Sequence, residues 1–290
     1  MTTRPPWFDG QLFPVTSRWL DIDGHSVHYV DEGSGPVLLM LHGNPTWSFV
    51  YRRMIAALSD HFRCVALDYP GFGLSAPAAG YAFTPPEHAE VVRRFVEALD
   101  LTDVTPLMQD WGGPVGMGAV LADPDRYAGF VVGNTLAWPV TPYIAAFSEV
   151  MGGRFTGDLL SRRLNLFVDR LIPMGMRRRT LSDAEMAMYR GPFPTMDSRL
   201  PIRVFPRQLV AARPFLQRLA DGLSQVADRP SLLLWADKDM AYKQPELRRW
   251  QQVLTNRTDH MLFGAGHYWQ DDAGEEASLV IRDWWGTRTA

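Results

Sequence analysis

The chain has 290 residues, of which 46% are hydrophobic and 21% are charged, and its formal net charge is −3. This composition is ordinary for a globular protein, and it lacks the basic excess that nucleic-acid or membrane-surface binding requires. No apolar run approaches the ~18 residues of a membrane span, and the single cysteine, Cys64, cannot form a disulfide within the chain. We therefore expect a cytoplasmic protein with no nucleic-acid or membrane partner.

Strand-like and helix-like segments alternate along much of the chain. Short apolar runs predict strands over residues 26–30, 36–41, 63–67, 104–107 and 129–132, and later over 232–234 and 261–263. Apolar residues at helical spacing predict a helix over 47–58 and another that Thr84 caps. This alternation predicts an α/β fold with a mostly parallel central sheet and helices on both faces. A ligand site is then expected beyond the carboxyl ends of the strands.

Residues 137–214 interrupt this alternation. They look mostly helical, contain many prolines and glycines, and hold six of the thirteen methionines. Methionine fills irregular apolar space, so these residues could roof a pocket or simply pack the core of their own segment. We predict a core domain formed by residues 1–136 and 215–290, with residues 137–214 inserted as a helical cap. The basic run 177–179 is predicted to be a solvated helix face.

The segment Met108-Gln109-Asp110-Trp111-Gly112-Gly113 follows a predicted strand and precedes small and apolar residues suited to a closely packed helix. A reactive side chain at such a turn defines a nucleophile elbow, which usually carries serine. Here the tip is Asp110, which excludes a serine esterase. A carboxylate can displace a leaving group from sp³ carbon and form an alkyl ester. Many elbows have glycine at the place of Met108, so its side chain is expected to point away from the tip.

Four segments together resemble the haloalkane dehalogenases of the α/β-hydrolase superfamily: 42–47 (HGNPTW), 68–75 (DYPGFGLS), 109–113 (QDWGG) and 264–267 (GAGH). The resemblance implies an enzyme that hydrolyses carbon–halogen bonds through an ester on Asp110. Its substrates would be a haloalkane and water, and its products an alcohol, a halide and a proton. No cofactor and no metal are implied. Members of the subgroup with this residue combination often self-associate, so a homo-oligomer is compatible with the resemblance.

Two further positions complete the expected catalytic group. His267 lies in the loop after the last predicted strand, where it could activate the water that cleaves the ester. Asp237 and Asp239 both follow the penultimate strand and could orient this histidine. The resemblance favours Asp239, with Asp237 as a turn residue. Some relatives carry the acid after an earlier strand, but residues 133–135 (Gly-Asn-Thr) contain no carboxylate.

A departing halide needs N–H donors and takes up no proton. The indole N–H of Trp111 and the side-chain amide of Asn44 are expected to bind it, and the backbone N–H groups of these two residues are expected to form the oxyanion hole. Both residues could instead be structural, Trp111 as a core aromatic and Asn44 as a turn former. Phe205 and Pro206 also resemble the stretch of this family that lines the halide pocket.

Three alternatives compete with this interpretation. Epoxide hydrolases share the fold, the aspartate and the histidine, but they use cap tyrosines, for which Tyr143 and Tyr189 are the obvious candidates, and commonly have histidine at the place of Gln109. Fluoroacetate-type dehalogenases place arginines where Trp111 and Gly112 stand. A non-catalytic binding or signalling protein on the same fold is the alternative from another class. It is disfavoured because every catalytic position is filled.

Overall fold

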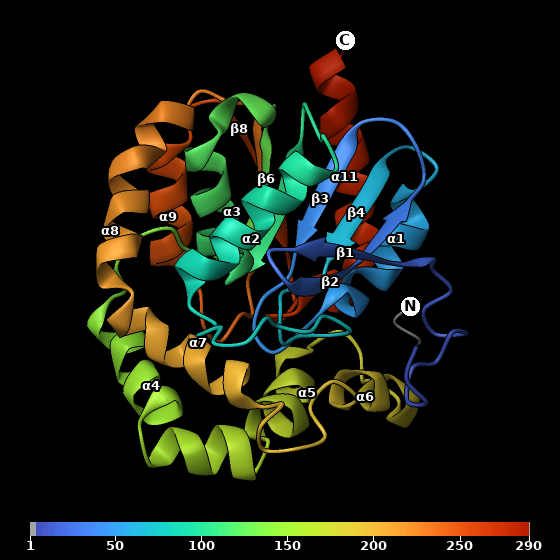
Figure 1. Ribbon diagram of the computed structural model, residues 1–290. Coiled ribbons are helices and arrows are strands. Elements are labelled where there is room, and N and C mark those ends of the chain that lie inside the picture. Colours follow the sequence, from blue (N-terminus) through green and yellow to red (C-terminus); the bar gives the residue numbers. More distant parts are fainter. Residues whose placement is uncertain (1–3, 290) are drawn as a thin grey trace.

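A twisted eight-stranded sheet runs through the centre of the computed structural model, which describes residues 4–289 (Figure 1). The strands lie in the order β1-β2-β4-β3-β5-β6-β7-β8. Strand β2 pairs antiparallel with both β1 and β4, and the remaining neighbours, β4-β3-β5-β6-β7-β8, pair parallel. Their bounds are Ser17–Ile22, His25–Glu32, Val37–Leu41, Arg63–Leu67, Thr105–Asp110, Phe130–Thr135, Ser231–Ala236 and Arg257–Leu262, for β1 to β8. Residues 1–3 and 290, which the predicted core domain includes, lie outside the described residues.

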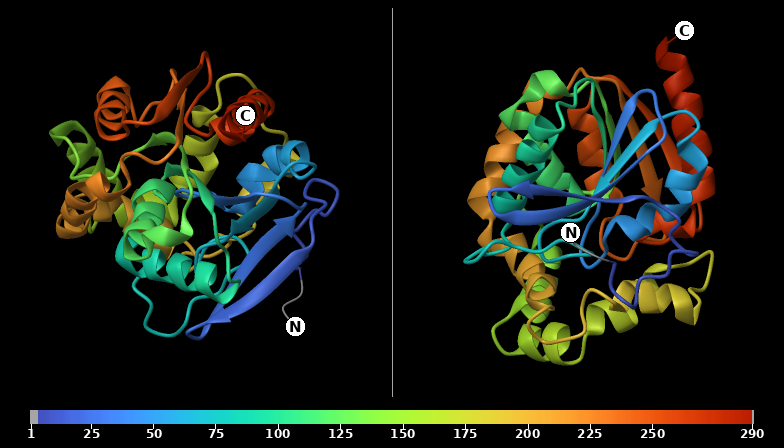
Figure 2. Two further views of the ribbon diagram at one scale, coloured as in Figure 1. Left: turned by 90° about the horizontal axis from the view of Figure 1, so that it is seen from above. Right: turned by 45° about the vertical axis from the view of Figure 1, so that its right-hand side comes forward.

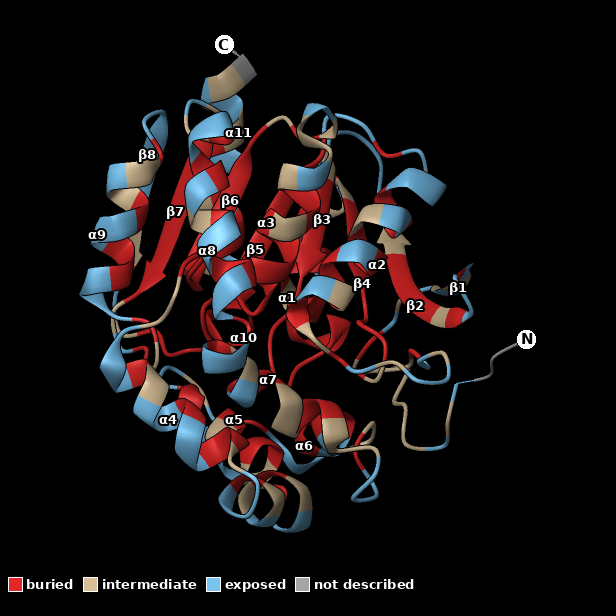
Figure 3. Cartoon of the chain, turned by 60° about the vertical axis from the view of Figure 1, so that its left-hand side comes forward, coloured by how far each residue is buried: buried red, intermediate tan, exposed pale blue. Residues whose placement is uncertain are grey.

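Helices cover both faces of the sheet (Figure 2). On one face α1 (Arg52–Leu58) packs against α11 (Gly274–Thr289), and on the other α3 (Gly112–Ala122) lies between α2 (Pro85–Ala98) and α8 (Arg213–Gly222). The central strands are buried on both sides, which explains their continuous apolar runs (Figure 3). The predicted α/β fold class is therefore confirmed.

Local sequence patterns predicted most of these helices and strands, and the structure differs from the prediction in two places. Thr84 stands at the N-cap of α2, as the sequence predicted, and Glu87 completes a capping box there. The predicted helix over 47–58 begins with a 3₁₀ turn, Ser48–Tyr51, before α1. Strand β1 was not predicted, because it is an edge strand with no apolar run, and only one of its six residues is buried.

The segment between β6 and α8 is helical and lies beside the carboxyl ends of the parallel strands, at the bottom of Figure 1. Its elements are α4 (Pro142–Gly152), two π-helical turns (Asp158–Arg163 and Phe167–Leu171), α5 (Ile172–Gly175), α6 (Asp183–Arg190) and α7 (Leu200–Ala211). α9 (Gln244–Val253) and the short α10 (Trp269–Asp272) follow β7 and β8. The division into core and cap at residues 136/137 and 214/215 stays a prediction.

The basic run 177–179 does not form the predicted helix face, although Arg177 and Arg178 are exposed as predicted. It lies in a bend, where the backbone N–H groups of all three arginines donate to the carboxylate of Asp272. The Arg179 guanidinium also pairs with Asp271 and Glu185. The acidic partners Asp271 and Asp272 lie more than ninety residues away in the sequence, so local charge could not reveal them.

Within the described residues, none of the helices is long and apolar enough to span a membrane.

Candidate active site

Asp110 stands at the tip of a sharp turn between β5 and α3. Its backbone has φ +51°, in the left-handed region that non-glycine residues rarely adopt, which marks a strained position. The turn is held in place by the Thr135 hydroxyl, which donates to the Asp110 carbonyl oxygen at 2.5 Å. Gly43 lies so close that a Cβ there would overlap the Asp110 carboxylate. The strand, the strained turn and the helix have the layout of a nucleophile elbow.

Met108 lies beneath this turn. Its side chain is fully buried and packs against Gly116 of α3, where an added Cβ would lie 2.7 Å from the Met108 sulfur. The small residue that lets the helix approach the strand therefore stands on the helix. This placement explains how the turn accommodates methionine two residues before Asp110.

The two carboxylate oxygens of Asp110 have different surroundings. Oδ1 accepts the backbone N–H of Asn44 at 2.7 Å. Oδ2 accepts the Tyr242 hydroxyl at 3.3 Å and lies 3.7 Å from His267 Nε2. Burial raises the pKa of Asp110, while the charge of His267 and backbone hydrogen bonds from Asn44 and Trp111 oppose that rise. Oδ1 is thus held by the backbone, and Oδ2 is the oxygen nearest to the imidazole.

His267 is paired with Asp239, as expected. His267 Nδ1 lies 2.8 Å from Asp239 Oδ2, and Asp239 Oδ1 accepts the backbone N–H groups of Ala241 and Tyr242. Burial lowers the pKa of His267, but the charge and hydrogen bond of Asp239 and the charge of Asp110 outweigh it, so the net shift is upward. Asp237 instead accepts the Gly264 N–H at 2.5 Å, which joins the two loops after β7 and β8.

Gln109 is a contact of His267 that sequence reasoning missed. Its Nε2 donates to the His267 carbonyl oxygen at 3.0 Å and lies 3.3 Å from the ring Nε2, while its Oε1 accepts from Gln270 at 3.1 Å. A carbonyl oxygen can only accept, so the amide must turn its N–H side toward His267. The ring Nε2 then faces a donor, which favours the neutral tautomer with its proton on Nδ1, toward Asp239.

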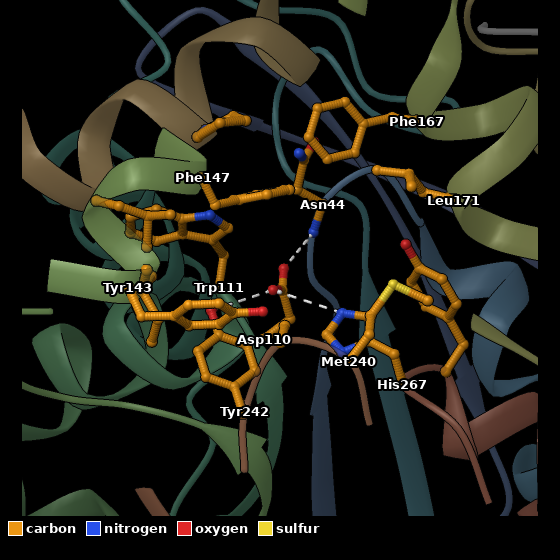
Figure 4. A pocket seen from close by; sticks show the side chains of 15 residues that line it. Asn44, Asp110, Trp111, Tyr143, Phe147, Phe167, Leu171, Met240, Tyr242 and His267 are labelled. Carbon is orange, nitrogen blue, oxygen red and sulfur yellow. Dashed lines mark hydrogen bonds and ion pairs between the residues drawn. The ribbon is translucent and has the colours of Figure 1, made fainter. Parts of the chain in front are cut away.

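A cavity of about 230 Å³ opens in front of Asp110 (Figure 4). Its wall is mostly apolar and comes from both sides of the site: Asn44, Asp110, Trp111, Tyr143, Ile144, Phe147, Phe167, Leu171, Pro206, Leu209, Met240, Ala241, Tyr242, His267 and Tyr268. The structure therefore brings four of the five predicted site residues to one cavity, with Asp239 outside its wall and in contact with His267, and it surrounds them with side chains suited to an apolar ligand.

The two predicted halide donors differ in their present contacts. The Trp111 indole N–H has no hydrogen-bond partner within residues 4–289, whereas the Asn44 amide donates to the Ile202 carbonyl at 3.3 Å. Pro206 lines the cavity, but Phe205 does not; its ring packs against Trp111 with centroids 4.9 Å apart.

The cavity contains three tyrosines. Tyr143 comes from α4, and Tyr242 and Tyr268, which sequence reasoning missed, come from the loops after β7 and β8. Tyr189, the other cap tyrosine considered, is not part of the wall: it is fully buried and donates to Asp271 at 2.8 Å. The suggestion that Tyr189 could donate a proton to a ligand in this cavity is therefore wrong.

Comparisons with known proteins agree with this fold. The family described as "alpha/beta hydrolase fold" matches residues 36–273. Haloalkane dehalogenase 2 of Mycobacterium tuberculosis is 42% identical, with 96% of this chain and 98% of that protein covered. The crystal structure of the haloalkane dehalogenase DatA from Agrobacterium tumefaciens superposes with a TM-score of 0.84 at 26% identity, covering 95% of this chain and 97% of that one. A cis-3-alkyl-4-alkyloxetan-2-one decarboxylase of Shewanella oneidensis is 28% identical, covering 93% of this chain and 88% of that protein.

The fold and the match over residues 36–273 define an α/β-hydrolase. Within that class, the chain belongs to the haloalkane dehalogenase family. The family resemblance predicted from the four sequence segments is confirmed.

Proposed function

We propose that this protein is a haloalkane dehalogenase that converts a haloalkane and water into an alcohol, a halide and a proton. One observation carries the proposal. The Asp110 carboxylate stands at a strained elbow in an apolar cavity, with Oδ1 held by the backbone and Oδ2 beside His267. This arrangement suits attack by Oδ2 on an sp³ carbon, followed by hydrolysis of the resulting ester.

In the first step, Oδ2 of Asp110 forms a bond to the carbon as the carbon–halogen bond breaks and the halide leaves with the electron pair. The side-chain N–H groups of Trp111 and Asn44 stabilise the departing anion. Support comes from the free indole N–H of Trp111 and from the place of both residues in the cavity wall. The Asn44 amide has a second N–H besides the one directed at Ile202.

In the second step, His267 Nε2 takes a proton from water as the water oxygen attacks Cγ of Asp110. The backbone N–H groups of Asn44 and Trp111 stabilise the oxyanion that forms at Oδ1. Alkylation also favours the neutral form of His267, which is the form that can accept a proton. The ester is neutral, so the Asp110 charge no longer raises the pKa of His267. Asp239 keeps the ring oriented and stabilises its protonated form.

We further propose that residues 137–214 act as a cap and that the protein works in the cytoplasm, as a monomer or a homo-oligomer. The related oxetanone decarboxylases suggest strained cyclic esters as a second substrate class to assay. No feature of the cavity favours that class over haloalkanes. Epoxide hydrolysis is disfavoured because, of the two cap tyrosines considered, only Tyr143 reaches the cavity.

The proposal is tested by trapping the ester. In His267→Phe the first step should proceed and the second should stop, so mass spectrometry after incubation with 1-bromobutane or 1,2-dibromoethane should find one alkyl group on Asp110. Asp110→Asn should give neither halide nor adduct. A folded His267→Phe protein that forms no adduct with any good bromoalkane would refute the two-step scheme. Parallel assays with styrene oxide and a β-lactone show whether halides are preferred.

A further inference from the structure

Tyr242 is a buried phenol that the two steps above do not use. It follows Asp239 by three residues in the loop after β7, lines the cavity, and is only 4% exposed. Its hydroxyl donates to Asp110 Oδ2 at 3.3 Å (Figure 4). Among the hydrogen bonds to Asp110, this one reaches the oxygen that the proposed mechanism alkylates.

The backbone of Tyr242 is fixed at both of its polar groups. Its N–H donates to Asp239 Oδ1 at 3.2 Å, and its carbonyl accepts from the Asn134 side chain at 3.3 Å. Its ring also stacks on His267, with centroids 6.0 Å apart and an angle of 28° between the planes. The same aspartate therefore holds the imidazole of His267 and the backbone of Tyr242.

Oδ2 of Asp110 takes part in both steps of the proposed reaction. Oδ2 first attacks carbon, and when the tetrahedral intermediate collapses, the Cγ–Oδ2 bond breaks and Oδ2 leaves as the oxygen of the alcohol. Negative charge then builds on Oδ2, and a donor there lowers the barrier. His267 Nε2 is 3.7 Å from Oδ2, farther than the Tyr242 hydroxyl.

We infer that Tyr242 is a further catalytic residue, whose hydroxyl donates a hydrogen bond to the departing alcohol oxygen during hydrolysis of the ester. This inference rests on the proposed role of Asp110. The proton that His267 took from water passes to Oδ2 and completes the alcohol, the water oxygen stays on Asp110, and Tyr242 keeps its own proton.

Two properties of the contact suit this role. Burial and the charges of Asp110 and Asp239 raise the pKa of Tyr242 well above its ordinary value, so the hydroxyl stays a donor at neutral pH. A distance of 3.3 Å is long for an O–H···O hydrogen bond, so the contact can shorten as charge develops on Oδ2.

The test measures the rates of ester formation and ester hydrolysis separately in Tyr242→Phe, by rapid quenching and mass spectrometry. Ester formation should keep its rate or become faster, because the attacking oxygen loses a hydrogen bond in the resting state. Ester hydrolysis should slow by about 10- to 100-fold, as expected for a lost hydrogen bond to a charged group. The alkyl-enzyme ester should therefore accumulate, and kcat and KM should fall together.

Tyr189→Phe is the matched control, because it removes another buried hydroxyl that donates to a carboxylate, at Asp271 and outside the cavity. It should lower stability without changing the ratio of the two rate constants. If Tyr242→Phe hydrolyses its ester at the parent rate, or slows both steps equally, the inference is wrong. The His267→Phe trap answers separately whether an ester on Asp110 forms at all.

Discussion

The two sides of the segment between β6 and α8 are attached to the rest of the molecule in opposite ways. On the α6 side, Arg52, Arg179, Glu185 and Asp271 form a buried ionic clamp between that segment and the core. On the α4 side, an apolar ridge of Tyr143, Phe147 and Val150 is 66%, 41% and 51% exposed. One side is anchored by charge, and the other borders the cavity with no comparable anchor among the residues that the structure describes.

The anchored side also lies next to the proposed base, His267. Asp271 and Asp272 follow His267 within five residues. Asp272 accepts the Gly266 N–H at 2.8 Å as well as the backbone N–H groups of the 177–179 bend. The position of His267 is therefore tied to the anchor, whereas the α4 side can vary its apolar surface without moving the base. Stability and substrate fit should accordingly depend on different sides of this segment.

The largest expected effect comes from Asp271→Asn. Asp271 accepts from Arg52 at 2.7 and 2.9 Å and from Arg179 at 2.5 Å, so the change leaves Glu185 as the one carboxylate of the clamp facing two guanidinium groups. Breaking such a buried pair costs about 3–5 kcal/mol, which urea unfolding would measure. Glu275→Gln removes the exposed pair with Arg53 and should cost less than about 1 kcal/mol. Equal losses in both variants would contradict the clamp as an anchor.

A second effect is the acid sensitivity of the clamp. Burial raises the pKa of Glu185, but the Ser182 N–H and the guanidinium groups of Arg179 and Arg52 outweigh it and lower that pKa to about 2. A carboxyl group with a lowered pKa stabilises the fold above its unfolded value of 4.5, and this contribution is lost as pH falls from 4.5 toward 2.

In that window the parent should lose up to about 1.4 kcal/mol more per pH unit than Glu185→Gln, since one additional proton is taken up on unfolding. Urea unfolding at several pH values measures both slopes. Parallel curves for the two proteins would show that Glu185 does not titrate as the clamp requires.

The smallest effect is expected on the α4 side. Phe147 lines the cavity and lies beside Phe167, so Phe147→Ala removes apolar surface that a substrate would cover. We expect a loss of about 1 kcal/mol in binding, or roughly fivefold in KM, and a stability change within about 0.5 kcal/mol. Phe155→Ala, at a residue that is 82% exposed and outside the cavity wall, is the control and should leave KM unchanged. A stability loss comparable to that of Asp271→Asn would remove the distinction between the two sides.

Much of the molecule was predictable because its signals are local. The apolar runs predicted the parallel strands, and the confirmed fold class and family follow from short segments at strand ends. Asp110, His267 and Asp239 stand in such segments, and the structure brings them together, although their catalytic roles stay proposals. Met108 was puzzling in the sequence because its compensation, Gly116, becomes a neighbour only when α3 packs on β5.

The α/β fold, the family and the residues at the elbow could be predicted from the order of residues, because each depends on periodicity or on a short motif. The surroundings of these residues depend on how the chain folds. Gln109 meets His267 across 158 residues, Tyr242 meets Asp110 across 132, and Arg52 meets Asp271 across 219. Such contacts depend on which loops the sheet order brings to one edge, and no local pattern of residue types specifies that.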